Sequence, residues 1–176
     1  YMKNKEEFYR FYKDRMLYEG AQPNVTHKAL AKLEQMGKLK AIVTQNIDGL
    51  HQMAGSKVVY ELHGSVMRNY CEKCGNFEYV KNSEGVPHCE CGGDIKPDVV
   101  LYEEGLDEEI VEKAIKAIEE ADVLIIGGTS LIVYPAAGLI DYYKGDKLVL
   151  ITIRDSRADL VINDSLGKVF SEIMDM

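Results

Sequence analysis

A chain of 176 residues with 46% apolar and 28% charged residues has the composition of a globular protein that can bury its own core. Its net charge of −8 argues against a nucleic-acid-binding protein, which would need a basic face, and is compatible with a cationic protein partner. No apolar run is long enough to span a bilayer and no signal-peptide pattern opens the sequence, so we expect a cytoplasmic protein with no membrane partner.

The N-terminal part of the chain should contain two helices. Residues 1–18 carry apolar side chains at helical spacing, and the stretch from Gly20 to Pro23 breaks that pattern. A second helix should begin after a cap at Asn24 and stop at Gly37. The expected apolar faces are Phe8, Phe11, Tyr12 and Met16 in the first helix, and Ala29, Leu30, Leu33 and Met36 in the second.

Two short predicted strands, at 41–44 and 58–62, are each followed by polar residues that suit ligand chemistry. In an open α/β sheet the carboxyl ends of the strands line the ligand crevice, so such groups can bind a polar ligand and move a proton. Asn, Asp and Gly are also common turn formers, and either segment taken alone favours an ordinary loop. The residues are Gln45, Asn46 and Asp48 after the first strand and His63 after the second.

The second half of the chain alternates helices with strands. Asp107 should cap a helix with an acidic first turn, and a helical stretch at 135–143 and a C-terminal helix follow it. Apolar runs at 123–126 and 147–151 indicate strands buried on both faces of a sheet, and 158–162 indicates a further short strand. This alternation predicts a doubly wound, Rossmann-like parallel α/β sheet.

All four cysteines lie between residues 71 and 91, in a C-x-x-C pair followed by a C-x-C pair. Four thiolates suit tetrahedral zinc. A redox dithiol is the main alternative, because C-x-x-C also occurs in thioredoxin-like sites, but a second pair so close by favours zinc. The predicted zinc ligands are Cys71, Cys74, Cys89 and Cys91.

Six segments carry a family resemblance. TQNIDGLHQMAG, ELHGSV and YCEKCG, followed by KPDVVLYEE, GGTSLIVYPAAGL and ADLVI, resemble in order and spacing the sequence signature of the sirtuins, the NAD-dependent protein-lysine deacylases. The resemblance covers nearly the whole chain. It implies an NAD-binding Rossmann-like domain formed by residues 1–67 and 98–176, and an inserted module of residues 68–97 that holds a structural zinc with no open position for a catalytic water.

The resemblance also implies an NAD site and a substrate site. NAD would contact Gln45, Asn46, Ile47, Asp48, Gly128, Thr129, Ser130, Thr152 and Leu166. Among these, Asp48 would bind the nicotinamide carboxamide, and Asn46 would orient the ribose and a water. An acyl-lysine peptide would add as a β-strand between one segment, Val100, Leu101 and Tyr102, and a second, Val133 and Tyr134.

The reaction that the resemblance implies is NAD-dependent removal of an acetyl or other acyl group from protein lysine, which releases nicotinamide and O-acyl-ADP-ribose. His63 would act as general base, which makes His63 and Asn46 the predicted catalytic residues. Two alternatives stay open at this point. One is a non-catalytic, zinc-stabilised module that binds an acyl-lysine peptide or another partner, and the other is a mono-ADP-ribosyltransferase.

The sequence departs from the sirtuin pattern in three places. The family's first strand, its G-A-G-x-S phosphate loop and its arginine-bearing loop do not occur, so we expect the sequence to be an incomplete record of a longer chain. Tyr102-Glu103-Glu104 stands where the family has Phe-Gly-Glu, which predicts an altered loop. Thr152 falls where the family begins an adenosine-contacting loop that contains Asn, and several residues of that loop are missing.

Overall fold

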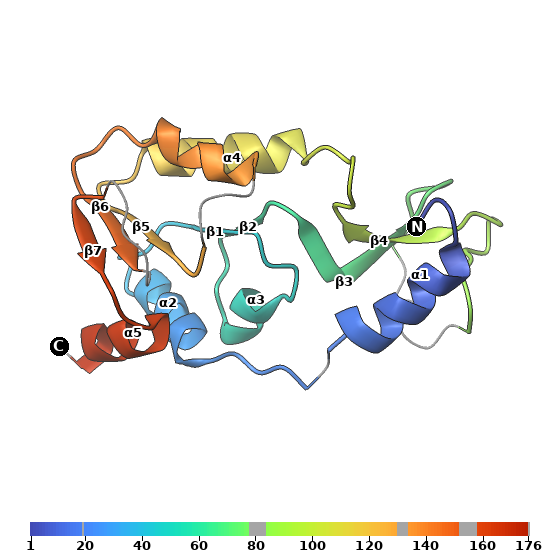
Figure 1. The fold of residues 1–176 in the computed structure, drawn as a ribbon, viewed down its shortest axis with the longest axis horizontal. Coiled ribbons are helices and arrows are strands. Elements are labelled where there is room, and N and C mark those ends of the chain that lie inside the picture. Colours follow the sequence, from blue (N-terminus) through green and yellow to red (C-terminus); the bar gives the residue numbers. More distant parts are fainter. Residues whose placement is uncertain (19, 78–83, 130–133, 152–157, 176) are drawn as a thin grey trace. The chain divides into compact units, whose positions relative to one another are not determined.

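The computed structural model describes residues 1–18, 20–77, 84–129, 134–151 and 158–175 (Figure 1). They form two compact units, and each is described by itself below. Unit 1 contains Tyr1–Ala21, Asn46–Gly49 and His63–Gly105, and unit 2 contains Gln22–Gln45, Leu50–Leu62 and Leu106–Met176. The predicted module of residues 68–97 falls within unit 1, and its status as a separate domain stays a prediction. None of the helices in the described ranges has the length and apolar character needed to cross a membrane.

Unit 1 is built on an antiparallel pair of strands. β3 (Gly64–Cys71) pairs with β4 (Ile95–Val99), and the register shifts between Ser65 and Asn69, where the strand is irregular. Helix α1 (Lys5–Phe11) continues directly into a turn of π-helix, η1 (Tyr12–Met16). Asn4 caps α1, because its side chain accepts a hydrogen bond from the backbone N–H of Glu7.

Two tyrosines connect α1 and η1 to this sheet through hydrogen bonds. Tyr9 and Tyr12 are fully buried, and their hydroxyls donate to the backbone carbonyls of Ile95 and Val66, respectively. The predicted helix is confirmed, but its predicted apolar face is partly wrong, since Phe11 is 53% exposed and Tyr9 is buried instead. Phe8, Tyr9 and Tyr12 pack together in the core of unit 1, so the buried face of the helix is centred on these residues and does not include Phe11.

Unit 2 contains short strands that pair in parallel. β1 (Ile42–Thr44) pairs with β2 (Val59–Glu61) in a two-stranded sheet. β5 (Leu124–Gly127), β6 (Leu148–Ile151) and β7 (Leu160–Ile162) form a three-stranded sheet in chain order. Parallel neighbours need crossover connections, which α3 supplies between β1 and β2 and η2 supplies between β5 and β6. This arrangement confirms the predicted Rossmann-like α/β class.

The described residues of unit 2 form the four helices that the sequence predicts and one, α3, that it does not predict. They are α2 (Val25–Gln35), α3 (Leu50–Ala54), α4 (Glu108–Glu119), the 3-10 helix η2 (Ala136–Tyr142) and α5 (Leu166–Asp175). The predicted caps are confirmed, because Asn24 accepts from the N–H of His27 and Asp107 accepts from the N–H of Ile110. Gly37 ends α2 with a φ of +70°, a conformation that costs glycine little.

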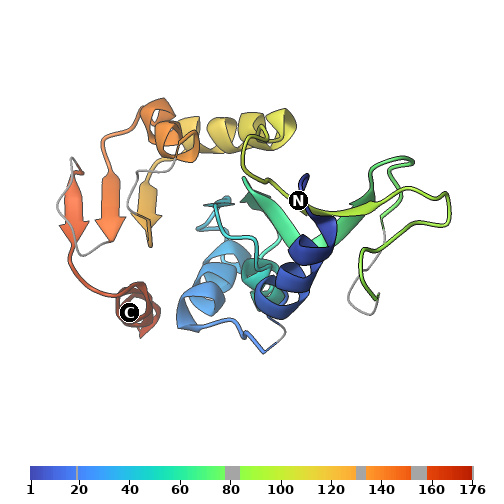
Figure 2. The same ribbon diagram turned by 45° about the vertical axis from the view of Figure 1, so that its right-hand side comes forward.

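Two apolar clusters pack against the three-stranded sheet of unit 2. Helices α4 and η2 bury Ala114, Ile118 and Leu139 in a cluster that includes Leu124 of β5, while α2 and α5 bury Ala29, Val169 and Phe170 against Ile151 of β6. Leu124 and Ile151 belong to opposite faces of the sheet by strand register, and Figures 1 and 2 show the strands between α4 and α5. Helices therefore cover both faces.

Two predictions of burial in unit 2 are wrong. Strand β5 is not buried on both faces, since Ile125 is 45% exposed. Ile125 belongs to the face of the sheet that α2 and α5 cover, but these helices pack on Val149 and Ile151 of β6 and on Ile162 of β7. Met36, expected on the apolar face of its helix, is 57% exposed, because α2 ends at Gln35.

Candidate functional site

The four cysteines meet at one end of the β3–β4 pair in unit 1. Their sulfur atoms all lie within 4.8 Å of one another, with Cys71 Sγ 3.4 Å from Cys91 Sγ and Cys74 Sγ 3.6 Å from Cys89 Sγ. Sulfurs bound at about 2.3 Å to a tetrahedral zinc would be about 3.8 Å apart. The donor set and its spacing therefore fit a zinc ion, as the sequence predicts, and none of the four thiols is in a disulfide.

A tight turn lets the shorter C-x-C pair act as half of a metal site. The Gly92 N–H donates to the carbonyl of Cys89 at 2.8 Å, and Gly92 has a φ of +77°, which favours glycine. At Gly93, a Cβ atom would lie 2.6 Å from Cys71 Sγ, so only glycine leaves room for the sulfur. The backbone turns sharply enough here to bring both sulfurs to the cluster, although only one residue separates them.

The thiol of Cys71 is prepared for metal binding. Hydrogen bonds from the backbone of Cys74 and Lys73 are the main interactions that lower its pKa to about 7, while burial acts in the opposite direction. The thiolate is the form that binds zinc, so a lowered thiol pKa reduces the cost of deprotonation at neutral pH.

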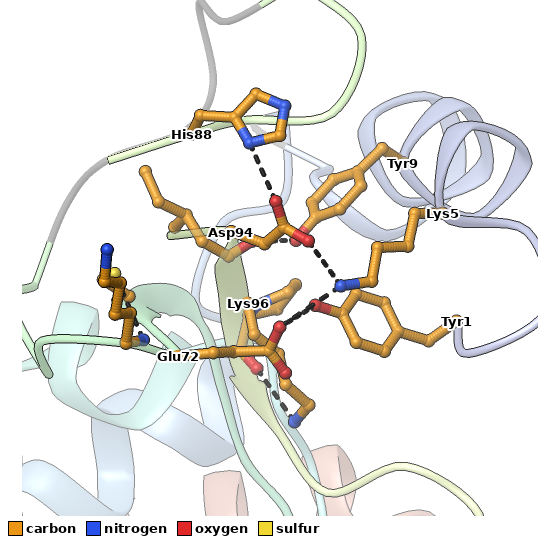
Figure 3. A network of polar contacts seen from close by, with 11 residues as sticks. Tyr1, Lys5, Tyr9, Glu72, His88, Asp94 and Lys96 are labelled. Atoms are coloured by element: carbon orange, nitrogen blue, oxygen red, sulfur yellow. Dashed lines mark hydrogen bonds and ion pairs between the residues drawn. The ribbon is translucent and has the colours of Figure 1, made fainter. Parts of the chain in front are cut away.

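A polar network joins α1 to the segment that carries the cysteines (Figure 3). Lys5 Nζ of α1 lies 2.5 Å from an Asp94 carboxylate oxygen and 3.4 Å from Glu72 Oε2. His88 Nδ1 contacts the other Asp94 oxygen at 2.8 Å, and the Tyr1 hydroxyl donates to Glu72 at 2.7 Å. These contacts hold α1 beside the residues that flank Cys71 and Cys91.

Unit 1 also places His63 beside two other predicted site segments. His63 lies in the turn before β3 and is half-buried, and its backbone carbonyl accepts from the N–H of Val100 at 3.0 Å. The carbonyl of Ile47 accepts from the N–H of Val66 at 2.9 Å. The next residue, Gly64, has a φ of +73°, and a Cβ there would lie 2.0 Å from the Asp98 carbonyl. Glycine thus allows β3 and β4 to approach closely beside His63.

The first predicted substrate segment follows β4 directly. Tyr102 is fully exposed, whereas Val100 and Leu101 are half-buried. Glu104 holds the turn, because its Oε2 accepts from the Leu101 N–H at 2.9 Å and from Lys96 Nζ at 3.0 Å. The sequence does not predict that Lys96 and Glu104 form a pair, because their contact depends on how the chain turns after β4.

Unit 2 contains the remaining predicted NAD residues. Gln45 follows β1, Gly127 ends β5, and Gly128, with a φ of +68°, comes directly after it. A Cβ on Gly127 would lie 2.4 Å from the side chain of Leu166, the first residue of α5. The structure thus brings Leu166 to this glycine pair, whose lack of side chains lets α5 pack closely against the end of β5.

Not all predicted residues are grouped in one unit. Unit 1 holds Asn46, Ile47, Asp48, His63, the segment from Val100 to Tyr102 and the cysteines, and unit 2 holds Gln45, Gly128, Thr129, Tyr134 and Leu166. Tyr134 is 75% exposed. Ser130, Val133 and Thr152 lie outside the described residues.

Known proteins resemble this chain over almost its full length. A model of the Sir2 family matches residues 1–135. Proteins described as NAD-dependent protein deacetylase from Clostridium perfringens and Clostridium acetobutylicum are 64% and 61% identical, covering 97% and 96% of this chain and 73% of each relative. A solved structure described as Sir2 with a p53 peptide and NAD⁺ is 39% identical, with a TM-score of 0.88 over 97% of this chain and 77% of the other. The family model matches most of the chain, the relatives are highly identical to it, and the solved structure shares its fold. The chain therefore belongs to the Sir2 family.

Proposed function

We propose that this chain removes acetyl groups from lysine side chains of proteins in an NAD-dependent reaction, with His63 as the general base. The observation that carries the proposal is the arrangement in unit 1, where β3 and the turn before it bind both Ile47 and Val100 through main-chain hydrogen bonds. This arrangement brings the backbone of a predicted NAD segment and of a predicted substrate segment to the strand that His63 precedes. Membership in a family whose relatives are described as NAD-dependent protein deacetylases supports the same conclusion.

The polar residues that follow β1 fit the nicotinamide half of NAD. The amides of Gln45 and Asn46 and the carboxylate of Asp48 offer both donors and acceptors, as a carboxamide and ribose hydroxyls require. We assign Asp48 to the carboxamide N–H₂ and Asn46 to the ribose and a water. Ile47 supplies an apolar contact, and Gly128, Thr129 and Leu166 are assigned to the remainder of the cofactor. When bound, NAD supplies the ribose carbon to which the acyl oxygen adds as nicotinamide leaves.

His63 has the chemistry required of a base in this reaction. A neutral imidazole can accept a proton from a ribose hydroxyl, which activates that oxygen for attack on the acyl carbon. The main-chain bond between the His63 carbonyl and Val100 fixes the backbone of the turn from which the ring projects. The zinc has a structural role in this proposal, because four cysteines would occupy every tetrahedral position.

The substrate is proposed to bind as an extended peptide beside Val100, Leu101 and Tyr102, and beside Val133 and Tyr134. Main-chain hydrogen bonds would supply most of its affinity, which allows proteins of different sequence to serve as substrates. We also propose a cytoplasmic location, since four reduced cysteines arranged for a metal suit a reducing compartment.

The His63→Ala variant of the full-length protein tests the proposal. Removal of a positioned general base costs about 10²–10⁴-fold in rate, so deacetylation of an acetyl-lysine peptide at saturating NAD should fall by that factor. Zinc content and melting temperature should stay close to those of the wild type. The matched control is His88→Ala, which removes an exposed imidazole in the same unit and should leave turnover within about threefold, well below the loss expected for a base.

Two outcomes would contradict the assignment in different ways. If His63→Ala turns over as fast as His88→Ala, His63 is not the base. If the wild type binds acetyl-lysine peptide but releases no nicotinamide, the protein is a binding module. Nicotinamide release with transfer of ADP-ribose to the protein substrate would identify a mono-ADP-ribosyltransferase.

A further inference from the structure

Lys96 is a charged residue within β4 that is only 5% exposed. Its ammonium donates to the Val99 carbonyl at 3.2 Å and lies 3.0 Å from a carboxylate oxygen of Glu104. It also lies 5.6 Å from the ring centre of Tyr70, its cross-strand neighbour on β3. A buried ammonium is costly unless it is paired and hydrogen-bonded, so these partners restrict where β4 and the following turn can go.

Glu104 closes the turn that follows β4. Its carboxylate accepts from both Lys96 and the Leu101 N–H, and its own N–H donates to the Leu101 carbonyl at 3.1 Å. Burial alone would raise the pKa of the Glu104 carboxyl, but the hydrogen bonds from Leu101 and Lys96 lower it below its ordinary value, so the group is ionised at neutral pH. Within this turn Glu103 has a φ of +72°, a left-handed conformation that a non-glycine residue rarely adopts.

We propose that the Lys96–Glu104 ion pair positions the substrate-binding segment of the deacetylase. The pair links β4 to the turn at Leu101–Glu104 and thereby keeps the strained residue Glu103 in place. Tyr102 stays fully exposed at that turn, where a bound peptide can reach it. Lys96 and Glu104 are positioning residues, because they act through the segment and not on the reacting atoms. This inference rests on the proposed function.

Loss of the pair should affect peptide binding more than the chemical step. Val100 is held separately by the His63 carbonyl, and the close approach of Gly64 to Asp98 is a main-chain feature. Neither contact involves the side chains of Lys96 or Glu104. Removal of the ion pair therefore loosens the turn beyond Val100 while the backbone around His63 keeps its contacts.

Steady-state kinetics of the full-length Glu104→Gln protein test the proposal. With an acetyl-lysine peptide at saturating NAD, KM should rise about tenfold, equivalent to about 1.4 kcal/mol, and kcat should change little. Lys96→Met should give the same pattern, while Lys96→Arg should keep KM near that of the wild type, since it retains the positive charge. The matched control is Glu109→Gln, which removes an exposed ion pair with Lys113 and should leave both constants unchanged.

Two kinetic results with the folded variant would overturn the inference. An unchanged KM in Glu104→Gln, or a fall in kcat without a rise in KM, means that the pair does not position the segment. If Glu104→Gln does not fold, Glu103→Gly/Glu104→Gln relieves the left-handed residue, and this double variant should fold with a raised KM. Failure of the double variant to fold would show that the pair supports the whole unit instead. If the wild type is inactive, the proposed function fails by itself, and calorimetric peptide affinities of wild type and Glu104→Gln then decide on the pair.

Discussion

The two units of this protein are stabilised in different ways. The core of unit 1 combines three aliphatic residues with the hydroxyl-bearing side chains Tyr9 and Tyr12 and two of the clustered cysteines, Cys71 and Cys89. The buried residues of the two unit 2 clusters are aliphatic residues and alanines with one Phe, supplied by helices and by the parallel strands on which they pack. Unit 1 therefore depends on a few specific contacts, and unit 2 depends on apolar surface spread over many residues.

The candidate site should therefore respond differently to substitutions in the two units. The turn that carries His63 and the segment from Val100 to Tyr102 both belong to unit 1. Loss of the metal or of the ion pair between the buried Lys96 and Glu104 should thus alter the substrate segment strongly. Unit 2 should respond to a change in proportion to the apolar area that the change removes.

Removal of zinc should have the largest effect and should fall on unit 1. Structural zinc sites contribute about 10–16 kcal/mol in small peptides, more than many domains have in total stability. Cys71→Ser, or chelation of the wild type, should abolish amide-hydrogen protection in β3 and β4 while β5 and β6 keep theirs. Hydrogen exchange with mass spectrometry measures both sets at once, and added zinc should restore the chelated wild type. Full protection of β3 and β4 in metal-free protein would show that apolar packing suffices for unit 1.

A core truncation in unit 2 should have an intermediate effect. Ile151 is 2% exposed and packs with Ala29, Val169 and Phe170, so Ile151→Ala should lower the free energy of unfolding by about 2–5 kcal/mol. The matched control is Leu160→Ala on neighbouring β7, where the side chain is 52% exposed and the loss should be about 0.5 kcal/mol. Urea unfolding monitored by circular dichroism gives both values. Equal losses at the two positions would mean that this cluster does not stabilise unit 2.

Removal of the Lys5 contacts should have the smallest effect. The side chains of Lys5 and Asp94 are 31% and 29% exposed, so solvent screening limits the loss in Lys5→Met to about 0.5–1 kcal/mol. The hydrogen bond from Lys5 is the main interaction that lowers the pKa of Asp94. The stabilisation that this bond gives the folded protein is present above the ordinary pKa of 3.8, and it disappears as the pH falls through the lowered pKa. The difference in stability between wild type and Lys5→Met should be present at neutral pH, well above the Asp94 transition, and should vanish in stronger acid.

Thermal melts of the two proteins at each pH provide this measurement, and the comparison cancels the protonation of the cysteines, which is common to both. A difference that persists in strong acid would show that the methylene chain of Lys5, rather than its charge, stabilises α1. A difference as large as that for Ile151→Ala would show that one partly exposed ion pair stabilises unit 1 as much as a core side chain stabilises unit 2.

The sequence by itself determined the class of fold and the position of most elements. Local signals were sufficient wherever the cause is local: Asn24 and Asp107 cap their helices by bonding an N–H three residues on, and Gly37 ends α2 in a left-handed conformation. The cysteine pairs could also be recognised, because ligand spacing reflects the coordination of a single ion. The roles assigned to His63 and Asp48 came from resemblance and stay predictions.

Tertiary structure alone decided which residues of each element are buried and which side chains meet. Tyr9 and Tyr12 are buried where their hydroxyls meet carbonyls of the sheet, and Phe11 is exposed, which residue type and helical spacing alone do not reveal. Ile125 is exposed although its strand is apolar, since burial depends on where the helices lie. Lys96 and Glu104 meet because the chain turns back after β4. Contacts between separate segments depend on the path of the chain between them, and neither periodicity nor residue type encodes that path.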